Sequence, residues 1–170
     1  MDRRGEMNLV DINALSPQAF EQAFGEIAEH SSWVAQRALA SRPFATREVM
    51  IQAFAQAVMQ ATKPEQLQLL RAHPDLATRA KLTADSSREQ AGAGLDALSA
   101  EEFAHFTMMN HAYKAKNQFP FIYAVKGATK HQILQGFESR IHNSVDEEFQ
   151  TAMTQVCRIV RFRLEDRVQA

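Results

Sequence analysis

The stretch that decides the fold is residues 144–164, SVDEEFQTAMTQVCRIVRFRL. Its apolar side chains recur at steps of three and four residues, which is the period of one face of an α-helix. They are Phe149, Ala152, Met153, Val156, Ile159, Val160 and Leu164. Ser144 with Glu147 three residues later forms a capping box, a common start of a helix. The stretch therefore predicts a long amphipathic helix.

The same helical period extends over most of the chain. Further helix starts are indicated at Ser16–Pro17, Thr46, Pro64 and Ser99 with Glu102. Residues 74–98 have a weaker pattern, typical of loops and caps, and Pro120 interrupts the helix that Ser99 begins. No segment alternates with the two-residue period of a strand. The sequence predicts an all-α fold, a single domain over residues 1–170 with about seven to nine helices.

Composition and charge exclude several classes of protein. The 170 residues are 45% hydrophobic and 23% charged, which is typical of a globular domain. Nineteen Lys and Arg against 20 Asp and Glu give a net charge of -1. That balance predicts no nucleic-acid partner and no attraction to an anionic membrane. The single cysteine, Cys157, excludes an internal disulfide.

The residues at the two ends and the lengths of the apolar stretches predict the cellular compartment. Residues 1–8 carry charge without an apolar run behind them, which is unlike a secretory signal. No stretch approaches the length of a membrane span. Residues 167–170, RVQA, are not a peroxisomal tripeptide. We therefore expect a cytoplasmic protein.

A metal site is not expected. Glu102 and His105 form one Glu-x-x-His unit, but di-metal sites in helical bundles need two. Glu138 and His142 have the wrong spacing for the second. Cys157 lies beside the apolar stripe of the last helix, so a packed thiol is favoured over a nucleophile.

His73 differs from the other histidines because it stands at a helix end, directly before Pro74. About ten residues later comes the polar segment Ser86-Ser87-Arg88-Glu89-Gln90. A hydroxyl, a carboxylate and an amide so close together suit a small polar ligand, and a helix start there would add N–H donors for an anion. The alternative is a plain capping box, with Ser86 as the cap and Glu89 three residues on.

Three further positions stand out. Arg163 lies at the edge of the apolar stripe of the last helix, so its guanidinium needs an anionic partner, either Glu89 or a carboxylated ligand. The alternative is a side chain that snorkels to water. Asn110 lies on an aromatic stripe, where a buried structural amide is favoured. Residues 119–127, FPFIYAVKG, surround a proline break, so a ligand could use backbone groups that no helix satisfies.

Together these segments resemble the family of 2-oxo-4-hydroxy-4-carboxy-5-ureidoimidazoline (OHCU) decarboxylases, which act in purine breakdown. The resemblance spans nearly the whole chain in one order. The matching segments are His73-Pro74-Asp75-Leu76-Ala77, Leu82-Thr83-Ala84 with Ser86-x-x-Glu89-Gln90, Gly94-Leu95, Asn110-x-x-Tyr113, Phe119-Pro120-Phe121-Ile122, Val156-x-x-Ile159 and Arg163-Leu164.

The resemblance implies an all-helical homodimer that needs no metal or organic cofactor and acts on OHCU. It implies that His73 is the catalytic acid–base, with Glu89 as a second catalytic group. The implied substrate contacts are Pro74, Ser86, Ser87, Arg88, Glu89, Gln90, Phe121, Ile122, Tyr123, Ala124, Val125 and Arg163. The absent peroxisomal signal suggests a bacterial, cytoplasmic member.

The chemistry of the substrate explains why such residues suffice. Its carboxylate sits on a carbon that bears a hydroxyl and adjoins a ring C=N bond. Electrons released with CO₂ can flow onto that nitrogen, so the substrate supplies the electron sink that a cofactor would otherwise provide. A histidine titrates near neutral pH and suits the proton transfer that sets the chirality of allantoin.

Two other classes of protein compete with this interpretation. His-Pro-Asp also occurs in J-domain co-chaperones, but there a basic helix precedes it, whereas residues 64–72, PEQLQLLRA, hold one acid and one base. A helical-bundle metalloenzyme is the second alternative, and metal analysis of the purified protein would test it.

Overall fold

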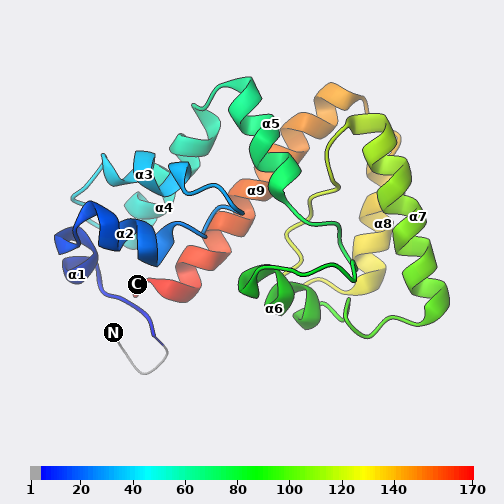
Figure 1. Ribbon diagram of the computed structural model, residues 1–170, viewed down its shortest axis with the longest axis horizontal. Coiled ribbons are helices and arrows are strands. Elements are labelled where there is room, and N and C mark those ends of the chain that lie inside the picture. The colour runs from blue at the N-terminus through cyan, green and yellow to red at the C-terminus, as the bar shows by residue number, and fades with distance from the viewer. Residues whose placement is uncertain (1–4) are drawn as a thin grey trace. The chain divides into compact units, whose positions relative to one another are not determined.

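The computed structural model describes residues 5–170, so the first four residues of the stretch considered for a signal lie outside it. Within this range the chain forms nine α-helices and no sheet, apart from an isolated bridge between Met7 and Val168. The predicted all-α class and helix number are confirmed. The helices are α1 (Leu9–Ala14), α2 (Pro17–Phe24), α3 (Trp33–Leu39), α4 (Arg47–Met59), α5 (Lys63–Ala72), α6 (Ala84–Gly92), α7 (Ala100–Asn117), α8 (Lys130–Arg140) and α9 (Val145–Arg167) (Figure 1). None of the helices described is long and apolar enough to cross a membrane.

Most predicted helix starts are confirmed by side-chain caps. The hydroxyls of Ser16, Thr46 and Ser99 each accept a hydrogen bond from the N–H three residues on, and Ser99 with Glu102 makes a full capping box. The capping box at Ser86 is wrong. Helix α6 begins at Ala84, and Thr83 is its cap because its hydroxyl accepts from the N–H of Ser86 at 3.3 Å. Ser86 therefore lies inside the helix.

The helices divide into two compact units. The first comprises the chain up to Ala72 together with Cys157–Ala170, that is, α1–α5 and the end of α9. Its core gathers around Phe20, whose ring centroid lies 5.1–6.3 Å from those of Phe24, Phe44 and Phe54. Val160 and Leu164 of α9 are buried in this unit. The bridge between Met7 and Val168 brings the two ends of the described chain together.

The second unit is continuous, from His73 to Val156, and holds α6, α7, α8 and the start of α9. Its core is aromatic. Phe137 of α8 stacks on Phe121 at 3.7 Å and meets Phe106 of α7 edge-on at 6.0 Å. These contacts pair α7 with α8, which lie together in Figure 1. Helix α7 ends at Asn117, before Pro120, as the proline break predicts, and its cap residue Gln118 is in the left-handed conformation.

Candidate active site

His73 lies on a loop of the second unit whose backbone is closely held. The side chain of His73 is buried, with 8% of its surface exposed, and Leu76 and Ala77 after it are buried too. Ala77 has a φ of +59°. This left-handed conformation costs a residue with a Cβ free energy, so the surrounding contacts must maintain it.

Three side chains supply those contacts. The Oε1 of Gln90 accepts from the N–H of Ala77 at 2.9 Å, and its Nε2 donates to the carbonyl of Asp75 at 3.4 Å. The Nδ2 of Asn110 donates to the carbonyl of Leu76 at 2.8 Å, which confirms the structural amide expected there. Lys114 pairs with the carboxylate of Asp75 at 2.9 Å. The loop after His73 is therefore bound to both α6 and α7.

Asn110 also leaves an acceptor beside this loop. Because its Nδ2 is fixed on Leu76, the orientation of the amide is set. Its Oδ1 is buried and has no hydrogen-bond partner within the part of the chain that the structure describes. Buried acceptors are normally satisfied, so this atom can still accept a hydrogen bond from a ligand or a water.

Helix α6 carries the predicted polar segment, and some of its side chains are buried while others are exposed. Ser86 and Gln90 lie one turn apart and are buried, and Glu89 is half-buried. Ser87 and Arg88 are exposed, and Arg88 forms an ion pair with Asp85 of its own helix. The buried residues suit a binding role better than the exposed ones, because only they lie where a ligand would be taken out of water.

The second predicted binding stretch, residues 121–125, is an irregular segment of the same unit. Its residues are buried except Tyr123, which is half-buried. Gly136 of α8 lies very close: a Cβ there would be 3.0 Å from a ring carbon of Tyr123. A larger residue at position 136 would therefore press on the segment.

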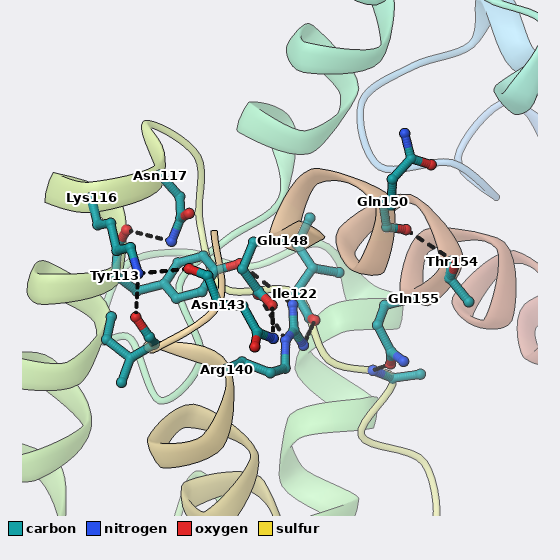
Figure 2. A network of polar contacts seen from close by, with 12 residues as sticks. Tyr113, Lys116, Asn117, Ile122, Arg140, Asn143, Glu148, Gln150, Thr154 and Gln155 are labelled. Atoms are coloured by element: carbon teal, nitrogen blue, oxygen red, sulfur yellow. Dashed lines mark hydrogen bonds and ion pairs between the residues drawn. The ribbon is translucent and has the colours of Figure 1, made fainter. Parts of the chain in front are cut away.

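A buried polar network lies behind this stretch, at the ends of α7, α8 and α9 (Figure 2). Arg140 donates from Nε to Glu148 at 2.9 Å and from Nη1 to the carbonyl of Ile122 at 2.7 Å. The hydroxyl of Tyr113 donates to the same carboxylate oxygen at 2.5 Å. Burial, and then the hydrogen bond to Glu148, raises the pKa of Tyr113.

Sequence reasoning missed this network, although a signal for it exists. Arg140 follows Ile133 and Phe137 at steps of four and three, the same stripe position that singled out Arg163. Glu148 similarly precedes Ala152 of the apolar stripe by four residues. A charge on each of two apolar stripes indicates a buried ion pair.

Arg163 has an anionic partner in the first unit. Its Nη1 donates to Glu29 at 3.0 Å and to the carbonyl of Ile27 at 3.2 Å. Both side chains of the pair are buried, with 3% and 1% exposed. The expectation of a buried guanidinium with a carboxylate is confirmed, and snorkelling to water is wrong. This carboxylate is Glu29, which the sequence did not single out, whereas the two partners predicted for Arg163, Glu89 and a carboxylated ligand, stay predictions.

The remaining candidates for chemistry are a metal cluster and Cys157. Residues 5–170 contain no group of three or more His, Cys, Asp or Glu side chains arranged to hold a metal ion. Cys157 is half-buried, and burial raises the pKa of its thiol. A raised pKa keeps the sulfur protonated, which suits a packed thiol rather than a nucleophile.

Comparison with known proteins identifies the family to which the chain is similar. The model of the OHCU decarboxylase family matches residues 13–165. The OHCU decarboxylase of Haloferax volcanii is 43% identical over 95% of this chain and 96% of its own. The uric acid degradation bifunctional protein of Bacillus subtilis is 40% identical over 92% of this chain and 32% of its own.

A solved structure has a fold similar to that of this chain. The crystal structure of an (S)-allantoin synthase has a TM-score of 0.74 and 30% identity, and the match covers 93% of this chain. The chain spans 53% of the length of that protein. With the family match over residues 13–165, the sequence-based prediction of a decarboxylase family is confirmed: the chain belongs to the OHCU decarboxylase family.

Proposed function

We propose that the protein converts OHCU to (S)-allantoin and CO₂ in urate breakdown, with His73 as general acid–base. The observation that carries the proposal is the placement of His73, buried on a loop whose backbone is held by Gln90 and Asn110. Catalytic groups need such fixed positions, because small displacements cost large factors in rate. Family membership supports the reaction class.

The chemistry requires no electron sink outside the substrate. The bond between the ring carbon and its carboxylate breaks and CO₂ leaves. The electron pair forms a double bond to the neighbouring ring carbon, and the C=N nitrogen of that carbon takes up the displaced pair and a proton. The hydroxyl then loses its proton to become a carbonyl while the neighbouring carbon, which bears the ureido group, is protonated on one face, and this gives a single enantiomer. A histidine can supply that proton and recover it at neutral pH. We therefore propose that the reaction is independent of metal and organic cofactors.

We assign the other roles by position within the second unit. Half-buried Glu89 would bind the substrate hydroxyl or set the protonation of His73. Ser86 and the Oδ1 of Asn110 offer polar atoms in buried surroundings. Residues 121–125 would contribute backbone contacts. For Gln90 the supported role is to hold the His73 loop, because its oxygen and nitrogen both bond that loop.

We also propose a cytoplasmic homodimer, as the family resemblance implies. The free thiol of Cys157 is compatible with a reducing compartment. Sedimentation of the purified protein at several concentrations would test the dimer, and a single monomeric species at micromolar concentration would contradict it.

The proposed function is tested by generating OHCU in place from urate with the two preceding enzymes and following circular dichroism. We expect rapid appearance of one allantoin enantiomer only when this protein is present, with or without chelator. A signal no faster than the spontaneous reaction would overturn the proposal.

The role of His73 is tested by His73→Asn, with His111→Asn on an exposed position of α7 as the matched control. We expect His73→Asn to fold normally and lose nearly all activity, since acid–base groups supply about 10²–10⁴-fold. The control should keep wild-type activity. If His73→Asn retains more than about a tenth of the wild-type rate, His73 is not the acid–base.

A further inference from the structure

Residues 121–125 are bonded to two helices through their backbone. Arg140, at the end of α8, donates from Nη1 to the carbonyl of Ile122 at 2.7 Å. Gln155, in α9, accepts with Oε1 from the N–H of Ala124 at 2.9 Å. One acceptor and one donor of the same short segment are thus fixed by side chains from different helices (Figure 2).

The side chain of Arg140 is itself immobilised. Besides its bond to Glu148, its Nη2 donates to the hydroxyl of Tyr113 at 3.4 Å, and its guanidinium lies 4.3 Å from the centre of the Phe121 ring. The Nδ2 of Asn143 donates to the second oxygen of Glu148 at 2.9 Å, and Glu148 has no exposed surface. A guanidinium held by this many partners fixes the carbonyl of Ile122 in one position.

These bonds determine which backbone groups of the segment are left for a ligand. The carbonyl of Val125 accepts from the N–H of Ala128 at 2.9 Å, so it is used as well. The N–H and C=O of Tyr123, like those of Phe121, make no hydrogen bond found within residues 5–170. Tyr123 is the half-buried residue of the two, and it lies between the two anchored residues. A donor and an acceptor on one residue complement an –NH–CO– unit, which is the repeating group of a ureide.

We propose that Arg140 and Gln155 are positioning residues of the decarboxylase, which fix residues 121–125 so that the N–H and C=O of Tyr123 meet the ureide part of the substrate. This inference rests on the proposed function. Neither residue need touch the substrate, because each acts through the backbone atom that it binds. Loss of the Gln155 anchor should weaken ligand binding more than it lowers the stability of the fold, because Gln155 is uncharged and takes no part in the ion pair of Arg140 with Glu148.

Gln155 is the better residue to vary, because it is half-buried and carries no charge. Gln155→Met keeps the length of the side chain and removes the acceptor, whereas Gln155→Glu keeps an acceptor for the N–H of Ala124. Gln150→Met is the matched control on the same helix. Gln150 is exposed, and Figure 2 shows its side chain pointing away from the other labelled groups.

The experiment measures the Kd of (S)-allantoin by calorimetry, together with KM, kcat and Tm. Allantoin is neutral, so the charge of Gln155→Glu does not obscure the result. We expect Gln155→Met to raise Kd and KM about tenfold, with kcat and Tm nearly unchanged, since one hydrogen bond is worth about a power of ten at most. Gln155→Glu should restore Kd to within about threefold of wild type, and Gln150→Met should leave it unchanged.

Wild-type affinity in Gln155→Met would overturn the inference, and so would an equal loss of affinity in Gln150→Met. If Gln155→Met does not fold, Gln155→Asn replaces it under the same criteria, because its shorter amide is drawn back from Ala124. A wild-type protein that neither binds allantoin nor accelerates its formation would instead refute the proposed function. The two failures are therefore distinguishable.

Discussion

Within the part of the chain that the structure describes, each of the two units contains a buried arginine–glutamate pair, and these two pairs are built alike. Arg163 bonds Glu29 at 3.0 Å in the first unit, and Arg140 bonds Glu148 at 2.9 Å in the second. Each guanidinium also donates to the carbonyl of an isoleucine in an irregular segment, Ile27 in one case and Ile122 in the other. In local chemistry the two pairs are nearly equivalent.

They differ in what they are connected to. Glu148 also accepts from Tyr113 and Asn143, so its pair belongs to a network that spans three helices. The carbonyl that Arg140 holds belongs to the proposed substrate segment, whereas Ile27 lies in the connection between α2 and α3. The same kind of ion pair can therefore stabilise a connection or shape a binding site. Which of the two roles a pair has depends on the segment whose backbone carbonyl its guanidinium binds.

The largest effect is expected from removing one partner of the network. Arg140→Ala leaves Glu148 buried without its counter-charge, which typically costs about 3–5 kcal/mol. Urea unfolding at neutral pH should show this loss. Arg161→Ala is the control, because Arg161 makes an exposed pair with Glu48, and such pairs contribute little. An equal loss in the free energy of unfolding for the two substitutions would mean that the buried network stabilises the fold no more than an exposed ion pair does.

A smaller and pH-dependent effect is expected at Tyr113. Tyr113→Phe removes a hydrogen bond to a buried carboxylate, at a cost of about 2 kcal/mol at neutral pH. Because the pKa of Tyr113 is raised in the folded protein, its contribution is complete below the ordinary tyrosine pKa and is lost as the pH rises beyond it.

The free energy of unfolding of the wild type should therefore fall above about pH 10, by about 1.4 kcal/mol per pH unit more steeply than that of Tyr113→Phe. Urea unfolding of both proteins between pH 8 and 11 would measure the two slopes. Parallel slopes would show that Tyr113 ionises as easily in the folded state as in the unfolded one.

The smallest change in stability is expected at the other pair. Arg163→Lys keeps the charge but loses the planar fork, so we expect a loss of about 1 kcal/mol. The decarboxylase activity of Arg163→Lys tests the role of Arg163 more directly than its stability does. If Arg163 contacts the substrate, as the family resemblance implies, the rate and the substrate affinity fall as well. Unchanged kcat/KM with a lowered Tm would limit Arg163 to its pairing with Glu29.

The sequence predicts the fold well because the helix signals are local. Ser16, Thr46 and Ser99 cap helices where their spacing indicates, and Phe149 to Leu164 mark α9. The misplaced start at Ser86 has a physical reason: two overlapping cap patterns compete there, and Thr83 is in the extended conformation that a cap requires.

The candidate site is less predictable, since its contacts join distant residues. Nothing local indicates that Gln90 bonds Ala77, 13 residues away, or that Arg140 holds Ile122, 18 residues away. Stripe positions show that a polar group will be buried, as for Arg163 and Asn110. They do not name its partner, because the partner depends on packing between elements.

The discontinuous first unit has a consequence for synthesis on the ribosome. Its N-terminal portion is made first, yet its core includes Val160 and Leu164 near the other end of the chain. At about 5–20 residues per second, several seconds separate the two portions. The N-terminal helices therefore lack the part of their core that Val160 and Leu164 supply while the second unit emerges. Nascent chains are thus most open to chaperones and to aggregation through their earliest-made helices.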